Sequence, residues 1–208
     1  MKNKKLLVSL LCLALSPLFT FVGTGVANAA VDTDAPVVNL GVLATIAMSC
    51  PSPVTMGSIT GTGPSALGSN STTCKVITNN SAGYKLEWKA GTAAMTNANS
   101  DTIAAYTPTS LTVPETWSIA PTASEWGGHL GALSTTPDTT TWGAADTYAG
   151  GKWLQVNDAA GYEIIRRTTD TLSSGDNEII FFGAEVGSGS FQPTGTYTVT
   201  VTMTATTL

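Results

Sequence analysis

Ionisable side chains are scarce in this sequence of 208 residues. Only 11% of the residues are Asp, Glu, Lys or Arg, less than half of the usual share of about 25%. After the three lysines among the first five residues, the cations form no cluster larger than Arg166-Arg167. The chain therefore lacks a basic surface that could neutralise phosphates or anionic lipid headgroups, and we expect no nucleic-acid partner.

Residue sets that carry catalytic or metal chemistry are also missing. His129 is the single histidine, and although Glu125 precedes it by four residues, no nucleophile motif accompanies the pair. Cys50, Cys74 and one histidine do not make a zinc set, and the third cysteine, Cys12, lies in the apolar N-terminal run. Asp32-Thr33-Asp34 and Ser174–Glu178 are small oxygen clusters, but neither fits an EF-hand loop, and turn chemistry explains the second. We expect no cofactor, metal or catalytic residue and predict that the protein is not an enzyme.

A hydrolase remains the last-ranked alternative, because two carboxylates can converge from distant strands without leaving a local motif. The acidic residues of this sequence occur mostly singly. Nothing in their spacing selects two of them as a catalytic pair.

Residues 1–29 have the three parts of a secretory signal peptide. A basic start precedes an apolar run from Leu6 to Val22, and Ala27-Asn28-Ala29 provides the small residues of a cleavage site. The alternative, a retained membrane anchor, is disfavoured because Pro17 interrupts the run. We predict bacterial-type export to the cell surface or medium, no membrane span after signal cleavage, and a single mature domain over residues 30–208.

Removal of this signal changes the charge and the cysteine count. Three of the nine cationic residues leave while all fourteen acidic residues stay, so the net charge falls to about −8. Cys12 also leaves, and Cys50 and Cys74 remain as a pair in an oxidising compartment. A disulfide between these two cysteines is therefore expected.

Alternation of apolar and polar residues predicts strands at both ends of the mature chain. Val38–Met48 alternates in this way, and in Thr196–Thr206 apolar side chains alternate with threonines. Further strands are predicted at Val54–Ile59, Cys74–Thr78, Tyr84–Trp88, Tyr162–Arg167 and Asn177–Val186. No segment keeps helical spacing over more than two turns. These patterns predict an all-β sandwich with a loop-rich middle insertion over residues 91–151.

Tryptophans are the side chains best able to bind a ligand. Trp88 alternates in phase with Tyr84 and Leu86, so we predict that it lies in the core. Trp126 and Trp142 adjoin glycines in sequence that looks like loop. Because an exposed indole can stack on a sugar ring, these two residues are the candidates for ligand or partner contact.

Two regions of the chain together resemble the spore coat U and fimbrial-pilin type of secreted domain. The first contains the strand that ends in Cys50, the P-x-x-V-x-M-G run at Pro51–Gly57 and the N-x-x-G-Y-x-L run at Asn80–Leu86. The second, Phe182–Ala205, has a phenylalanine-glycine start and a late G-x-Y strand. The resemblance leaves the middle of the chain unmatched.

This resemblance implies an incomplete immunoglobulin-like sandwich with one disulfide, Cys50–Cys74. It also implies that subunits polymerise when the N-terminal extension of one fills the missing-strand groove of the next, with Val31–Val38 as the candidate donor. The predicted function is a structural subunit of a cell-surface fibre, pilus or coat that assembles with itself or other surface subunits through β-strand edges. The alternative is a secreted glycan- or wall-binding module that uses Trp126 or Trp142.

Overall fold

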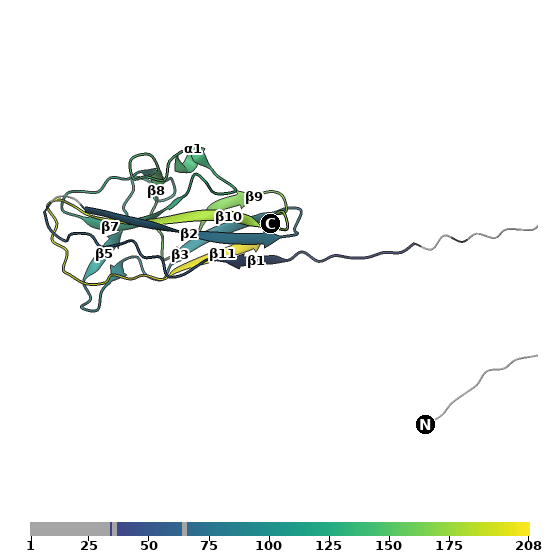
Figure 1. Cartoon of the computed structure of the whole chain (residues 1–208), viewed down its shortest axis with the longest axis horizontal. Helices are drawn as coiled ribbons and strands as arrows, with labels where there is room; N and C mark the ends of the chain where they lie inside the picture. The colour runs from purple at the N-terminus through teal and green to yellow at the C-terminus, as the bar shows by residue number, and fades with distance from the viewer. Residues whose placement is uncertain (1–33, 35–36, 64–65) are drawn as a thin grey trace, which may run out of the picture. The chain divides into compact units, whose positions relative to one another are not determined.

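The computed structural model describes residues 34, 37–63 and 66–208. The predicted signal peptide and most of Val31–Val38 therefore lie outside the described residues. The chain divides into two units, Met1–Gly41 and Val42–Leu208. The described residues of the second unit contain eleven strands and one helix of four residues (Figure 1). The predicted all-β class is confirmed.

A large sheet forms one layer of the fold. Its strand order is β1-β2-β10-β7-β5-β4. The two long strands in it, β2 and β10, pair antiparallel from Ala66↔Val186 to Val76↔Asp176, whereas β5 and β7 pair in parallel. The strands are β1 Ile46–Ser49, β2 Ala66–Thr78, β4 Met95–Thr96, β5 Thr102–Ala105, β7 Ser124–Leu130 and β10 Asp176–Val186.

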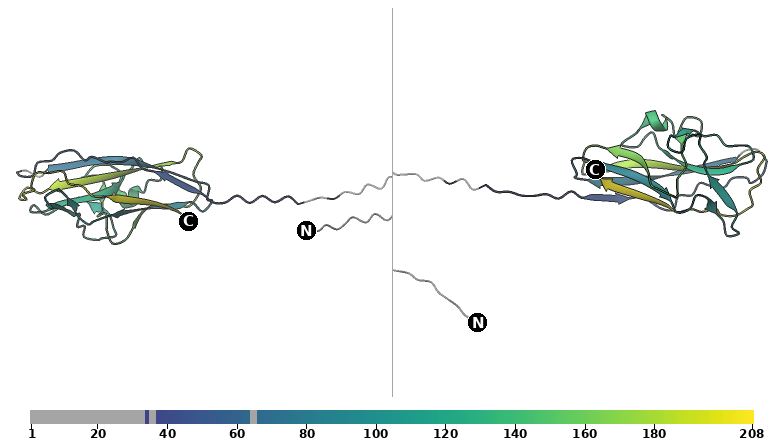
Figure 2. Two further views of the ribbon diagram at one scale, coloured as in Figure 1. Left: turned by 90° about the horizontal axis from the view of Figure 1, so that it is seen from below. Right: turned by 180° about the vertical axis from the view of Figure 1, so that it is seen from behind.

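A smaller sheet packs against the large one and completes the sandwich. Its order is β11-β3-β9, with both pairings antiparallel. Figure 2 shows the strands from below and from behind. The three strands are β3 Tyr84–Ala90, β9 Tyr162–Arg167 and β11 Val201–Thr207. A separate two-stranded ladder joins β6 (Glu115–Thr116) to β8 (Lys152–Trp153).

The core lies between the two sheets and follows the alternation of β3. Tyr84, Leu86 and Trp88 are fully buried, as expected from their common phase. The edge of the Trp88 ring meets Trp142, with the ring centroids 5.5 Å apart. Across the sandwich, the large sheet contributes buried side chains that include Val76 and Ile180. Burial of alternate side chains from both sheets is the physical basis of this fold.

The region 91–151, predicted to be a loop-rich insertion, also supplies strands to the large sheet. It provides β4, β5 and β7, and β7 lies between β10 and β5. Trp117 of this region stacks on Tyr106 with centroids 4.3 Å apart, and the same cluster includes Trp153 and half-buried Phe181 of β10. Because Ile180 points into the main core, its neighbour Phe181 lies on the opposite face. The middle region therefore covers the outer face of the large sheet.

The predicted first strand is shorter in the structure than its sequence pattern indicates. Of the predicted Val38–Met48, only Ile46–Met48 pairs with β2, together with the following Ser49, and Val54–Ile59 forms no strand. Pro51 and Pro53 have no amide hydrogen to donate to a ladder, which explains why pairing stops after Ser49. Alternation showed that these segments can be extended, but it did not show which parts have a partner.

The predicted disulfide is confirmed: Cys50, which follows β1, bonds to Cys74 of β2 across a sequence separation of 24. Replacing both residues (Cys50→Ala with Cys74→Ala) is expected to lower the free energy of unfolding by about 3.5 kcal/mol, because the unfolded chain loses a closed loop. Urea denaturation of the oxidised protein and the double variant measures the difference. A loss below about 1 kcal/mol would contradict this estimate.

Candidate assembly edge and groove

β11 is the edge strand of the small sheet, and half of its backbone groups point away from that sheet. Just before it, Thr200 O accepts from Gly91 N at 2.8 Å, and just after it Leu208 N donates to Gly83 O at 3.1 Å. In an antiparallel pair, alternate residues bond the partner strand. The even-numbered residues of β11 therefore bond β3. The N–H and C=O groups of the odd-numbered residues, Val201 to Thr207, point to the open side.

The odd-numbered side chains of β11 point into the sandwich but are only half-buried. Val201, Met203 and Ala205 pack against the main core, whereas the intervening threonines are exposed. β1, the edge strand of the other sheet, lies next to β11 (Figure 1) and shows the same half-burial at Ile46 and Met48. Between these two edges the core is thus incompletely covered, in contrast to the fully buried inward side chains of β3.

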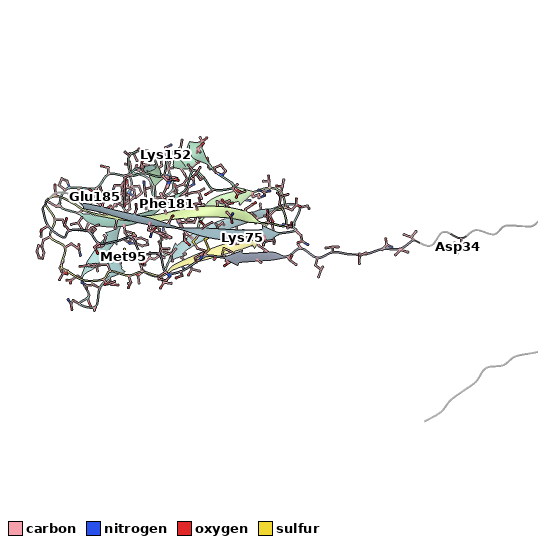
Figure 3. The ribbon with its side chains drawn as sticks, in the orientation of Figure 1. Asp34, Lys75, Met95, Lys152, Phe181 and Glu185 are labelled. Atoms are coloured by element: carbon pink, nitrogen blue, oxygen red, sulfur yellow. A yellow bond between two sulfur atoms is a disulfide. The ribbon has the colours of Figure 1, made fainter. Side chains whose placement is uncertain are left out.

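A groove of about 850 Å³ lies between the segments that continue these two edges. Residues 53–62, which follow β1, form one wall, and residues 191–198, which precede β11, form the other. Met95, labelled in Figure 3, and Val186 are among the buried apolar residues that line it. A hydrogen bond of 2.8 Å from Gln192 N to Gly61 O joins the two walls.

The chain also contains an extended apolar segment that pairs with no strand in the described ranges. In residues 37–44, Val38, Leu40 and Val42 alternate with Asn39 and Gly41. Val38, Leu40 and Val42 are 90%, 88% and 79% exposed. We call residues 37–44 the apolar segment. Its composition suits a half-buried strand, yet no ladder includes it in the part of the chain that the structure describes.

The apolar segment is anchored at its C-terminal end. Asn79 Nδ2 donates to Leu43 O at 3.0 Å, and Thr45 N donates to Asn79 Oδ1 at 2.7 Å. The chain then enters β1 at Ile46. These bonds fix where the paired part of the chain begins.

The two tryptophans predicted to contact a ligand are both buried. Trp126 is 1% exposed and lies in β7, where its Nε1 donates to Ala93 O at 3.0 Å. Trp142 is 2% exposed and ends helix α1 (Thr139–Trp142), with its ring at the edge of Trp88. The prediction that these rings face a ligand is corrected: neighbouring glycines indicated loops, but both indoles fill the core.

His129, the single histidine, is also buried. Its Nδ1 lies 2.9 Å from Lys152 O and its Nε2 3.3 Å from Asp146 Oδ1. Glu125 does not join it, because the Glu125 carboxylate accepts from the backbone and hydroxyl of Thr107. The two residues weighed as an acid–base pair therefore have separate structural partners.

The described residues lack a metal-binding cluster and a helix that could span a membrane. They contain no group of three or more His, Cys, Asp or Glu side chains placed to hold a metal ion. In the same described ranges, no helix has the length and apolar character needed to cross a membrane. Of the two oxygen clusters compared above with an EF-hand loop, Asp32-Thr33-Asp34 falls almost entirely outside the described residues.

The open edge of β11 and its groove are the features that sequence reasoning located least well. The alternation of β11 was visible in the sequence, but its position at an edge depends on long-range pairing.

Comparisons with protein-family models, curated proteins and solved structures gave no match for this chain. The interpretation of the site therefore depends on its own geometry.

Proposed function

We propose that the protein is a structural subunit of a cell-surface fibre, pilus or coat, and that its copies join by addition of a β-strand along β11. The observation that carries this proposal is the edge itself. The odd-numbered residues of β11 combine backbone groups that pair with no strand among the described residues and side chains that are half-buried and mostly apolar. An added strand would form hydrogen bonds with these backbone groups and would cover these side chains. In such a joint the main-chain hydrogen bonds give affinity and the alternate side chains give register.

The apolar segment of a second copy is the proposed added strand. Its alternating Val38, Leu40 and Val42 place three apolar side chains on one face, and these would lie against the groove between residues 53–62 and 191–198. This assignment moves the donor from Val31–Val38 toward the C-terminus, onto described residues whose apolar side chains are exposed. The disulfide fits assembly outside the cell, because such bonds persist in oxidising compartments.

Proline at Ala205 tests whether assembly uses the β11 edge. The amide of Ala205 points to the open side, so Ala205→Pro removes a hydrogen bond to an added strand but none to β3. We expect the mature wild-type protein to form multimers and the variant to stay monomeric with a folded circular dichroism spectrum. Size-exclusion chromatography and negative-stain microscopy measure the difference. Ala205→Val, which keeps the amide, is the matched control and should assemble; multimers of Ala205→Pro would refute use of this edge.

A further inference from the structure

Four side chains form a polar cluster that joins the two sheets through the interior. Asp176 and Glu178 extend from β10 of the large sheet, Tyr84 from β3 of the small sheet, and Arg167 from the end of β9. Tyr84 and Glu178 are 0% exposed and Asp176 is 3% exposed. Burying two carboxyl groups costs stability unless each is hydrogen-bonded or neutralised, so the arrangement of protons in this cluster matters for the fold.

The Tyr84 hydroxyl is shared by both carboxyl groups. Its oxygen lies 2.8 Å from Glu178 Oε1 and 3.2 Å from Asp176 Oδ2. A hydroxyl has one proton, so it cannot donate to two carboxylates at once. If both acids were ionised, the Tyr84 oxygen would face one of the two carboxylate oxygens with no proton between them, and both atoms can only accept.

The charges around the pair differ between its members. Arg167 Nη1 lies 3.1 Å from Asp176 Oδ2 and neutralises that carboxylate. No ion pair in the described residues reaches Glu178, and Thr136 N donates to its Oε2 at 3.3 Å. On β2 the residues opposite Asp176 and Glu178 are Val76 and the disulfide-bonded Cys74, neither of which titrates. Among the described residues, Glu178 thus has hydrogen-bond donors but no counter-ion.

We propose that the proton of Glu178 is a pH-dependent lock between the two sheets. When Glu178 is protonated, it donates to Tyr84, Tyr84 donates to Asp176, and Arg167 balances the one negative charge. Every group in the cluster then has a partner of the correct kind. Loss of the proton leaves two carboxylates competing for one hydroxyl, with Arg167 as their one ion-pair partner among the described residues, and weakens the joint between β10 and β3. This inference does not depend on the proposed assembly.

The direction of the pKa changes agrees with this geometry. Burial raises the pKa of Glu178, the Asp176 charge raises it further, and the hydrogen bonds from Tyr84 and Thr136 do not reverse the rise. Burial and the nearby Glu178 charge raise the pKa of Tyr84 as well, so its hydroxyl keeps its proton. Because the folded state binds the Glu178 proton more tightly than the unfolded chain, where the pKa is about 4.3, the contribution of Glu178 to stability is largest below that value. It falls as the pH rises toward the folded-state pKa.

Glu178→Gln tests the lock, because glutamine keeps the shape of the acid but cannot ionise. In wild type, we expect the unfolding equilibrium constant to increase by up to about tenfold per pH unit between the unfolded and folded pKa values of Glu178. Urea denaturation between about pH 4 and about pH 8 should show this increase in wild type and its loss in Glu178→Gln. Glu87→Gln, which removes an acid paired with Lys85 on the outer face of β3, should retain it.

A direct titration decides the question even if Glu178→Gln does not fold. Carbon-13 NMR of the glutamate side-chain carboxyls in the wild-type mature protein should show one signal that titrates above the ordinary glutamate value. Two results would overturn the proposal: every glutamate titrating near its ordinary value, or a folded Glu178→Gln variant with an unchanged pH dependence.

Discussion

Leu40→Asp is expected to abolish self-association of the mature protein and to leave the β-sandwich as stable as in wild type. Leu40 is 88% exposed in the apolar segment, so its own domain loses little when the side chain changes. In the proposed assembly the same side chain faces the part of the groove that Met95 and Val186 line, where an unpaired carboxylate costs several kcal/mol. Since each 1.4 kcal/mol is a factor of ten in affinity, the dissociation constant should rise by at least about a hundredfold. Analytical ultracentrifugation measures the assembly, and thermal denaturation measures the stability.

Asn39→Asp is the matched control for this prediction. It introduces the same charge one residue away, on the opposite face of the segment, where the side chain would point out of the groove. Assembly should persist in this variant. Equal loss of assembly in both variants would show that net charge, and not strand register, is responsible. Full assembly in both would exclude the apolar segment as the added strand.

Mixing two variants tests the segment and the edge together. Leu40→Asp keeps an intact β11 edge, and Ala205→Pro keeps an intact apolar segment. Each should be monomeric alone, and together they should form a one-to-one dimer that cannot extend, because only one of its two junctions can form. If Ala205→Pro blocks assembly and Leu40→Asp does not, β11 accepts a different strand, such as β11 of another copy.

The sequence predicted the parts of the fold in which one face of a strand is buried. The alternation of Tyr84, Leu86 and Trp88 gave both the strand and its inward face, and the alternation in Val201–Thr207 gave the phase of β11. The disulfide followed from the compartment and from an even cysteine count. In each case the residues themselves carried the signal, because burial on one face imposes a period of two.

β7 could not be predicted in the same way. It lies between β10 and β5, and its residues from Trp126 to Leu130 are all buried, so no alternation marks it. Gly127 and Gly128 suggested a loop, but each leaves room for a neighbour in the packed sheet. A Cβ on Gly128 would lie 2.7 Å from Cζ3 of Trp88, and one on Gly127 would lie 2.8 Å from Leu154 O. The glycines are there for close packing, which only the long-range pairing reveals.

The candidate site was predictable only in part, for a related reason. Alternation showed that residues 38–48 and 196–206 can form strands, but whether such a strand has a partner depends on how many strands each sheet contains. The open edge arises because the small sheet ends at β11. For Trp126 and Trp142 the prediction was wrong in the other direction: the neighbouring glycines suggested exposed side chains, but the tertiary fold buries both of them.

Trp88→Ala is expected to lower the free energy of unfolding by about 3–5 kcal/mol, the usual cost of truncating a fully buried large aromatic side chain. Trp88 is 0% exposed, and its ring meets Trp142 and Tyr162 at centroid distances of 5.5 and 6.4 Å. For a domain of this size each kcal/mol corresponds to about 2–4 °C, so the melting temperature should fall by roughly 6–20 °C. Urea and thermal denaturation measure the two quantities.

Two control variants separate packing from other effects of changing Trp88. Lys89→Ala changes the next, exposed residue of β3 and should be nearly neutral. Trp88→Phe keeps an aromatic ring and removes an indole N–H that is buried without a hydrogen-bond partner among the described residues, so it should cost much less than alanine because no bond is broken. If alanine and phenylalanine are equally harmful, the shape of the full indole is what the core requires. If alanine costs less than about 1 kcal/mol, Trp88 does not join the two sheets as the structure indicates.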